Sequence, residues 1–223
     1  MVLSLINKNK AMKEITRRHF VSHTYPNSEI AERFRTIRTN IQFSSIDKKH
    51  QLLMITSPSN GEGKTTAAVN LAISISQQGE KVLLIDANLR RPKLQQAFNI
   101  KETKGLTDVL IEGIPLEEAV FQTQIGQLDV LSSGTIPPNP AEIIGSGAMS
   151  RFLIEARKEY NVVIFDCPPV LETTETKLLA GQCDGVVLTL NSGRTDQEKA
   201  LEANRLLKLV RANVLGVILN AGE

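Results

Sequence analysis

The sequence predicts an α/β fold, a doubly wound and mostly parallel sheet with helices on both faces, preceded by an amphipathic N-terminal helix. Two observations lead to this prediction. After residue 50, short runs of aliphatic and β-branched residues alternate with longer segments of helical character. Most of the short runs are almost continuously apolar, as strands covered on both faces of a parallel sheet are. Such alternation implies right-handed crossovers between parallel strands.

The individual elements follow from these patterns. The expected strands are Leu52–Thr56, Lys81–Ile85, Leu128–Leu131, Val162–Phe165, Val186–Leu190 and Val214–Leu219. The expected helices are Ser28–Phe43, Lys64–Gln78, Ala141–Tyr160, Thr173–Gly181 and Thr195–Ala212. We expect the last helix to begin with a capping box, in which Thr195 and Glu198 satisfy each other's backbone amides.

The expected helix Ser28–Phe43 stands apart from the alternating pattern. Its apolar residues fall on one stripe, and three charged residues spaced by three fall on a neighbouring, more exposed stripe. The apolar stripe is Ile30, Phe34, Ile37 and Ile41, and the charged one is Glu32, Arg35 and Arg38. Periodicity alone predicts a docking helix with a charged outer face.

Length and composition favour an ordinary globular protein. The chain has 223 residues, of which 41% are hydrophobic, with 14 Gly and 9 Pro, which excludes collagen-like and low-complexity classes. No apolar run reaches the roughly 20 residues that cross a bilayer, and lysines interrupt the start before any secretory cleavage site. Cys167 and Cys183 have neither disulfide-framework nor metal-site spacing. We therefore expect a cytoplasmic protein.

Charge is unevenly distributed along the chain. Residues 1–50 carry ten Lys or Arg and four Asp or Glu, a net +6, and residues 51–223 carry a net −4. This asymmetry favours an anionic neighbour such as a membrane surface or an acidic protein, and a merely solvated leader is the alternative. Nucleic acid is not expected, because the basic arm offers only Phe20 and Tyr25 for stacking. We expect residues 1–24 to form a basic, flexible arm and residues 25–223 a single domain.

The segment Ser57–Thr66 lies directly between a predicted strand and a predicted helix. Its backbone N–H groups and the helix N-terminus are suited to hold phosphate oxygens. Gly61 and Gly63 permit positive φ and close backbone approach. A strict P-loop has glycine six positions before the lysine, where this chain has Pro58. A glycine-rich turn without a ligand is the alternative.

Within this loop each side chain has an expected task. Lys64 should reach the β- and γ-phosphates, facing solvent while the site is empty, and Thr65 should place its hydroxyl on Mg²⁺. Glu62 and Thr66 complete the nucleotide-binding loop.

Two further predicted strands end in acids. Asp86 continues as Ala-Asn88-Leu-Arg90-Arg-Pro, and Asp166 continues as Cys-Pro-Pro. Because parallel strands end at one edge of the sheet, we expect Asp86 and Asp166 to meet beside the phosphate loop on its metal side. Alternatively, each acid caps the helix that follows it.

Taken together, these motifs resemble the bacterial tyrosine kinases (BY-kinases) of polysaccharide-synthesis operons, whose fold is similar to that of the MinD/ParA class of P-loop ATPases. The resemblance covers roughly residues 25–220. It rests on Gly61-Glu-Gly-Lys-Thr65, on Asp86–Pro92 against D-x-D-L-R-x-P, and on Asp166-Cys-Pro-Pro against D-x-P-P. It rests also on Glu32-x-x-Arg35-x-x-Arg38 against E-x-x-R-x-x-R.

The resemblance implies a kinase that autophosphorylates and transfers the γ-phosphate of ATP to protein tyrosines, thereby regulating capsular or exopolysaccharide synthesis. It implies catalytic roles for Lys64, Asp86 and Asp166, a nucleotide contact from Arg90, and Mg²⁺ binding by Thr65, Asp86, Asn88 and Asp166. It also implies a homo-oligomeric ring formed through Glu32, Arg35 and Arg38. The cytoplasmic tail of a membrane-embedded activator would hold the chain at the inner face of the cell membrane.

Two departures from the family pattern keep alternatives open. Asn88 stands where the family has a second acid, and no tyrosine cluster ends this sequence, whose only tyrosines are Tyr25 and Tyr160. A MinD/ParA-like nucleotide switch is one alternative, although Ser59 stands where those proteins carry a second lysine. A weakly active nucleotide-binding adaptor of a polysaccharide exporter is the other, and Asn88 keeps it open.

Overall fold

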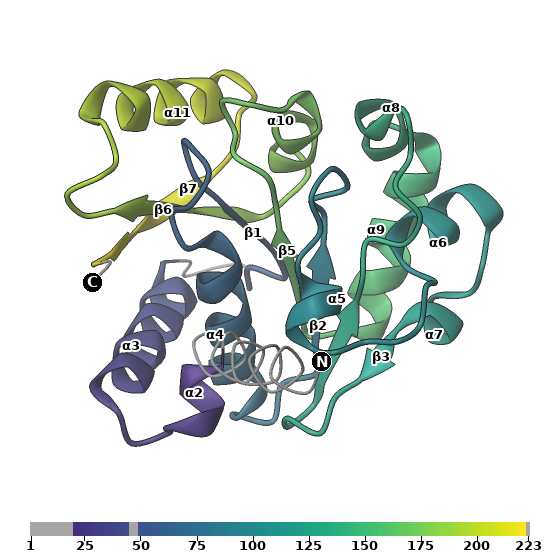
Figure 1. Cartoon of the computed structure of the whole chain (residues 1–223), viewed down its shortest axis with the longest axis horizontal. Coiled ribbons are helices and arrows are strands. Elements are labelled where there is room, and N and C mark those ends of the chain that lie inside the picture. Colours follow the sequence, from purple (N-terminus) through teal and green to yellow (C-terminus); the bar gives the residue numbers. More distant parts are fainter. Residues whose placement is uncertain (1–19, 45–48, 222–223) are drawn as a thin grey trace, which may run out of the picture.

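The computed structural model describes residues 20–44 and 49–221, which contain one seven-stranded sheet of order β3-β4-β2-β5-β1-β6-β7 (Figure 1). Its strands are β1 (Leu52–Thr56), β2 (Val82–Asp86), β3 (Phe121–Gln122), β4 (Leu128–Leu131), β5 (Val162–Asp166), β6 (Gly185–Asn191) and β7 (Val214–Asn220). Neighbouring strands run parallel except for β3, which pairs antiparallel with β4. The predicted mostly parallel sheet is confirmed.

Helices cover both faces of this sheet (Figure 1). One face carries α2 (Val21–Thr24), α3 (Glu29–Phe43), α4 (Lys64–Ser76) and α5 (Leu94–Ala97). The other face carries α6 (Leu106–Glu112), α7 (Leu116–Ala119), α8 (Pro140–Ile144), α9 (Gly147–Glu159), α10 (Thr174–Ala180) and α11 (Gln197–Leu209). No helix within residues 20–44 and 49–221 is long and apolar enough to span a membrane.

Each face of the sheet has its own hydrophobic core, which explains the unbroken apolar strands. Along β1, Leu52 and Met54 belong to one core, whereas Leu53 and Ile55 belong to the other. Successive side chains of a strand point to opposite faces, so a strand covered on both sides needs an apolar residue at every position. Strands β1, β2 and β5 are buried along their whole length.

The predicted continuous helix Ala141–Tyr160 is wrong. The segment forms α8 and α9, which are separated at Gly145 and Ser146. The Ser146 hydroxyl accepts a hydrogen bond of 3.3 Å from the Met149 amide and thereby caps α9. A serine within an apparently helical stretch therefore marks a new helix start here.

The predicted capping box at Thr195 is also wrong. Asp196 is the N-cap of α11, and its carboxylate accepts from the Glu198 amide at 2.8 Å. The Thr195 hydroxyl instead accepts from the Asn191 amide at 2.7 Å and closes the turn after β6. Thr, Asp and Asn compete for such positions, so the sequence alone leaves the cap uncertain by one residue.

The N-terminal helix exists as α3, capped by the Ser28 hydroxyl. Ile30, placed on the buried stripe by its spacing, is 50% exposed, and Ala31 is buried in its place. Residues 20–24, expected to belong to the flexible arm, are folded: Phe20 is buried and packs edge-on against Phe98, with ring centroids 4.7 Å apart. The remainder of the predicted arm, residues 1–19, lies outside the described residues.

Candidate active site

The loop between β1 and α4 has the backbone that its glycines predict. Gly61 and Gly63 have φ values of 81° and 85°, in the left-handed region that side chains disfavour. Gly63 is also the N-cap of α4, and a Cβ at this position would lie 2.3 Å from the Asn220 amide nitrogen at the end of β7. Position 63 therefore requires glycine for two reasons: its φ is positive, and the Asn220 side chain leaves no room for a Cβ.

Lys64 lies folded over its own loop. Its ammonium donates to the Ser57 hydroxyl at 2.9 Å and to the Ser59 carbonyl at 3.4 Å, and the residue is only 8% exposed. The expectation that it faces solvent is wrong. Burial lowers the pKa of Lys64, and the Asp166 carboxylate opposes this effect. A cation held by neutral oxygens is available to an anionic ligand that replaces them.

Thr65 and Asp166 meet as the sequence predicts. The Thr65 hydroxyl donates a hydrogen bond of 2.7 Å to the Asp166 carboxylate, although the two residues are 101 positions apart. Thr65 is the second residue of α4 and Asp166 ends β5, so the first turn of the helix faces the carboxyl edge of the sheet. A hydroxyl beside a carboxylate is a donor set that suits Mg²⁺, a hard cation that takes oxygen ligands.

Asp86 lies beside Asp166, because the two residues pair directly in the parallel register of β2 and β5. The Asp86 carboxylate accepts hydrogen bonds from the amides of Asn88, Lys93 and Leu94, at 3.1, 2.7 and 2.8 Å. Burial raises the pKa of Asp86, and the Asp166 charge raises it further, while the three amides oppose this rise. The carboxylate is thus fixed in orientation and held close to a second acid.

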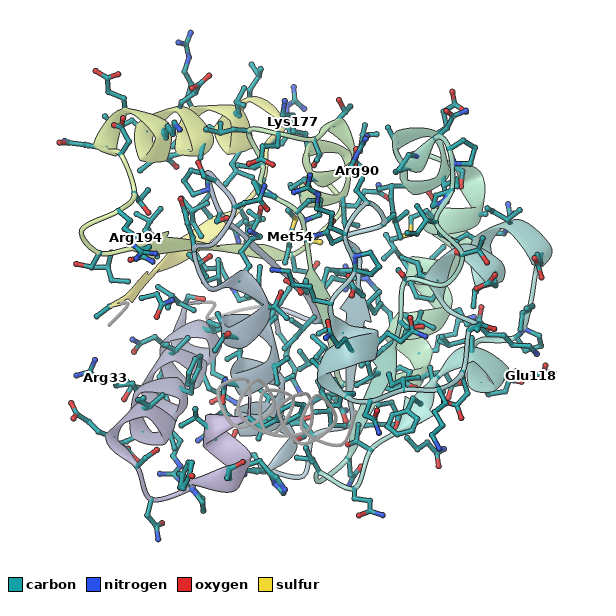
Figure 2. All side chains as sticks on the ribbon, in the orientation of Figure 1. Arg33, Met54, Arg90, Glu118, Lys177 and Arg194 are labelled. Carbon is teal, nitrogen blue, oxygen red and sulfur yellow. The ribbon has the colours of Figure 1, made fainter. Side chains whose placement is uncertain are left out.

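Asn88 and Arg90 are engaged within the protein. The Asn88 side-chain oxygen accepts from the Arg91 amide at 3.1 Å and so closes the turn after β2. Arg90 forms a two-pronged ion pair with Glu175 of α10, with Nε–Oε1 at 2.5 Å and Nη2–Oε2 at 3.3 Å. Figure 2 shows Arg90 beside α10. Glu175 is 1% exposed, and the Arg90 guanidinium compensates its buried negative charge.

Glu62 and Thr66 differ in their surroundings. Glu62 is buried, and its Oε2 atom has no hydrogen-bond partner among the described residues. Burial raises the pKa of Glu62, and Thr195 and Lys64 oppose this shift. Thr66 lines a mostly apolar cavity of about 260 Å³ that also contacts Phe34, Ile218 and Asn220.

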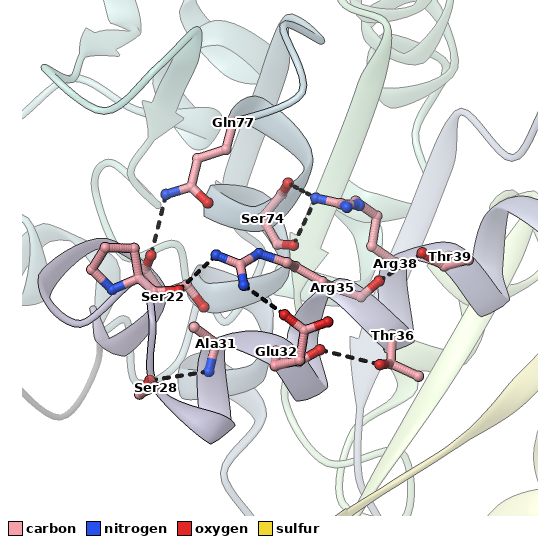
Figure 3. Close-up of polar contacts among 11 residues, drawn as sticks. Ser22, Ser28, Ala31, Glu32, Arg35, Thr36, Arg38, Thr39, Ser74 and Gln77 are labelled. Carbon is pink, nitrogen blue, oxygen red and sulfur yellow. Dashed lines mark hydrogen bonds and ion pairs between the residues drawn. The ribbon is translucent and has the colours of Figure 1, made fainter.

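The three charged residues of α3 do not form a free stripe. Arg35 pairs with Glu32 at 2.6 Å and also donates to the Pro26 carbonyl at 2.6 Å. Arg38 turns toward α4, where it donates to the carbonyl and the hydroxyl of Ser74 at 2.6 and 3.2 Å (Figure 3). Burial lowers the pKa of Arg38, with a contribution from the Arg35 charge. Arg38 therefore connects α3 to the phosphate-loop helix.

Sequence reasoning missed three residues of this site. Asn220 reaches Gly63 from the last strand, Glu175 anchors Arg90 from α10, and Lys93 donates its backbone amide to Asp86. Asn220 and Glu175 act across the sheet from distant parts of the chain. No local pattern marks them, and only the strand order brings them to the loop.

Comparison with known proteins places this geometry in a family. A family model described as an AAA domain matches residues 50–212. Tyrosine-protein kinase YwqD of Bacillus subtilis is 44% identical over 215 residues, covering 96% of this chain and 90% of that protein. A putative tyrosine-protein kinase in the cps region of Klebsiella pneumoniae is 35% identical over 85% of this chain and 26% of that protein.

Solved structures agree with the sequence relatives. The chimerical protein CapA2B2 superposes with a TM-score of 0.87 at 37% identity, covering 91% of this chain and 89% of that one. The septum site-determining protein MinD of Pyrococcus horikoshii, complexed with Mg-ADP, has a TM-score of 0.62 at 27% identity, covering 76% and 70%. The predicted family is confirmed: the chain belongs to the bacterial tyrosine-protein kinases, which share the P-loop fold of MinD.

Proposed function

We propose that this chain binds ATP with Mg²⁺ at the loop between β1 and α4 and transfers the γ-phosphoryl group to tyrosine hydroxyls of proteins. One observation carries the proposal. Lys64 and Thr65 of the loop converge with Asp86 and Asp166 of two adjacent strands, in a chain that belongs to the tyrosine-kinase family. Phosphoryl transfer depends mainly on positioning and charge stabilisation, and these residues can supply both.

The loop would hold the phosphates through its backbone. Its N–H groups and the first turn of α4 favour negative charge, and the left-handed glycines let the chain approach a ligand closely. The Lys64 ammonium would exchange its two neutral oxygen partners for phosphate oxygens and stabilise charge on the transferred group. The cavity beside Thr66 and Asn220 is large enough for a nucleotide base, and we assign it to that group.

Thr65 and Asp166 are the residues proposed to hold Mg²⁺, directly or through water. The ion would neutralise phosphate charge. Their hydroxyl and carboxylate oxygens already lie 2.7 Å apart, so little rearrangement is required of the chain. The Asn88 side chain closes its own turn, so we give it at most a water-mediated role.

Asp86 is the residue proposed to orient the acceptor phenol and take its proton. A raised pKa makes this carboxylate a better proton acceptor than an exposed aspartate. Its three amide contacts fix its position, which favours directional proton transfer over general electrostatic help.

The cellular context of this kinase is also a proposal. The relative in a cps region supports a role in capsular or exopolysaccharide synthesis. We propose a homo-oligomeric ring that uses Glu32 and Arg35, with Arg38 supporting α3 on α4. Basic residues of the segment 1–50 would aid attachment to the inner face of the cell membrane through the tail of a membrane-embedded activator.

Replacement of Lys64 tests the chemistry. Lys64→Met should lower tyrosine phosphorylation with Mg·ATP by roughly two to three orders of magnitude or more, because a charge-stabilising donor is lost. Lys158→Met, at an exposed position of α9, is the matched control and should retain full activity. Phosphotyrosine immunodetection and thermal unfolding of both variants measure transfer and folding separately. A folded Lys64→Met variant with wild-type transfer would place the active site elsewhere.

A further inference from the structure

The loop that follows β2 places a group of basic side chains at the edge of the candidate active site. Arg90, Arg91 and Lys93 lie within four positions, although residues 51–223 as a whole carry a net charge of −4. All three are exposed. We call Arg91 and Lys93 the basic rim, because Arg90 is already paired with the buried Glu175.

The backbone of the basic rim is fixed by the site itself. The Lys93 amide donates to the Asp86 carboxylate at 2.7 Å, and the Arg91 amide donates to the Asn88 side chain at 3.1 Å. Asp86 in turn lies in register with Asp166. Lys93 is therefore attached through its main chain to the acid that we propose as the base for the phenol. Arg91 is attached to the side chain of Asn88, whose own amide donates to the same acid at 3.1 Å.

The side chains of the basic rim are available to a ligand. Among residues 20–44 and 49–221, the side chains of Arg91 and Lys93 form no hydrogen bond and no ion pair. The charge of Lys93 nevertheless reaches the site, where it lowers the pKa of Lys64 and of Asp166, after the larger effects of burial and nearer groups. Lys93 thus combines exposure with proximity to the reacting groups, and Arg91 is exposed two positions before it in the same loop.

We propose that the basic rim selects acceptor segments in which the tyrosine is flanked by aspartate or glutamate. The inference rests on the proposed kinase function. Carboxylates next to an incoming tyrosine would meet Arg91 and Lys93 on the approach to Asp86, and complementary charge of this kind governs specificity and association rate. The family motif D-x-D-L-R-x-P leaves position 91 open and ends before position 93. These positions are therefore free to define the substrates of this chain.

The acceptor explains the basic rim better than the nucleotide does. The proposed phosphate ligands are a buried lysine and the amides of the loop, and Lys64 is 8% exposed. Arg91 and Lys93 are exposed and belong to a different loop, which follows β2. A nucleotide role for them is treated below as a contrary outcome.

Two tyrosine peptides of equal length test the proposal, one with glutamates and one with glutamines on both sides of the tyrosine. In the double variant Arg91→Ala plus Lys93→Ala, the KM for the glutamate peptide should rise about tenfold, since each exposed ion pair contributes a few-fold. The KM for the glutamine peptide and for ATP should stay unchanged. Arg205→Ala plus Lys208→Ala removes the same two charges from exposed positions of α11 and should change nothing.

Charge reversal sharpens the test. Arg91→Glu plus Lys93→Glu should disfavour the glutamate peptide and favour a peptide with lysines beside the tyrosine. An equal loss for all peptides, or a higher KM for ATP, would overturn the proposal and assign the basic rim to catalysis or to the nucleotide. Equal use of both peptides by the wild-type chain would overturn it as well.

Binding measurements separate this proposal from the kinase function. A fluorescent glutamate peptide with phenylalanine in place of tyrosine cannot be phosphorylated, so its anisotropy reports recognition alone. The wild-type chain should bind it about tenfold more tightly than the matching glutamine peptide at low salt, with the difference lost at high salt. Selective binding without any transfer would refute the kinase function alone, and transfer without selectivity would refute the basic rim alone.

Discussion

Arg38 of α3 donates a hydrogen bond of 2.6 Å to the backbone carbonyl of Ser74 in α4, and so joins the helix proposed for assembly to the helix that begins at the phosphate loop. The same guanidinium contacts the Ser74 hydroxyl. Assembly through α3 and nucleotide binding at α4 therefore share a rigid contact.

Removal of Arg38 should weaken the fold more than removal of a surface arginine. Arg38→Ala loses two charged hydrogen bonds, and we expect the free energy of unfolding to fall by about 2 kcal/mol. Arg33→Ala is the matched control. Both side chains of the Arg33–Glu29 pair are exposed, so the pair should contribute less than about 0.5 kcal/mol to the free energy of unfolding. Urea unfolding of both variants measures the difference. Equal stability of the two variants would contradict the structural role of Arg38.

Assembly should depend on Arg35 and Arg38 together. We predict a salt-sensitive homo-oligomer that Arg35→Ala plus Arg38→Ala dissociates, because Arg35 loses its charge-assisted pair with a neighbouring subunit and Arg38 no longer holds α3 on α4. Light scattering across salt and protein concentrations measures the mass. The single variant Arg38→Ala separates loss of assembly from loss of the α3–α4 contact. A wild-type chain that is monomeric under every condition would remove the prediction.

Asn88→Asp should strengthen the dependence on Mg²⁺. Aspartate retains an oxygen acceptor for the Arg91 amide, so the turn survives. The new charge lies beside Asp86, which is in register with the proposed Mg²⁺ ligand Asp166. We expect half-maximal activity at a several-fold lower Mg²⁺ concentration. Asn161→Asp is the control, because its side-chain oxygen also accepts a backbone N–H, from Lys81, at 2.8 Å. Identical metal titrations for all three proteins would show that position 88 does not sense the ion.

Stability should decrease as pH rises above the ordinary carboxyl range. Burial raises the pKa of both Asp86 and Asp166, so the folded chain keeps protons that the unfolded chain releases above about pH 4. The free energy of unfolding then falls with pH between the ordinary and the raised pKa values, and below that interval these groups have no effect. Urea unfolding at a series of pH values measures the slope.

Two substitutions should change the free energy of unfolding at neutral pH in opposite directions, because the pKa of Asp166 is raised and that of Asp184 is lowered. Asp166→Asn should reduce it and stabilise the chain at neutral pH. At Asp184 burial alone would raise the pKa, but the Arg157 pair and two backbone amides outweigh it and lower the pKa. Asp184→Asn should therefore destabilise the chain at neutral pH and have little effect in acid. The same sign for both variants would be inconsistent with the assigned pKa shifts.

Tyr160 should remain unlabelled after incubation with Mg·ATP. It is 6% exposed, lies two positions before the start of β5, and its hydroxyl donates to Asp129 at 2.9 Å. Burial and the Asp129 charge raise the pKa of Tyr160, which further disfavours its reaction. Tyr25 is 50% exposed, so residual self-phosphorylation should map to it and disappear in Tyr25→Phe but persist in Tyr160→Phe. Stoichiometric labelling of Tyr160 would contradict the strand topology.

The sequence predicted those parts of the molecule that depend on neighbouring residues. The buried strands, α4 and the loop around Gly63 follow from contiguous patterns, and the pairing of Asp86 with Asp166 follows from parallel strand ends. The short elements α5, α6, α7 and β3 were not predicted, since helices of one or two turns are stabilised by packing more than by propensity. Ser146 and Asp196 show that caps depend on local competition among polar side chains.

The remaining contacts of the site join residues that are far apart in the sequence. Asn220 and Glu175 contact Gly63 and Arg90 only because the sheet brings separate crossovers to one edge. Arg38 was predicted to be exposed, yet α3 lies on α4 and turns its guanidinium inward. Such contacts require the complete strand order, which no local motif contains.

The position of β1 in the sheet also determines when a nascent chain can assemble its active site. Strand β1 is the first strand of the sheet in sequence, yet it pairs with β5 and β6, which are translated more than a hundred residues later. Long-range pairing of this kind forms late, after the loop-closure entropy has been overcome. The hydroxyl of Thr65 cannot meet Asp166 until β5 has left the ribosome. Synthesis therefore postpones phosphoryl transfer until nearly the whole domain has been made, and a truncated chain that ends before β5 lacks the metal side of its site.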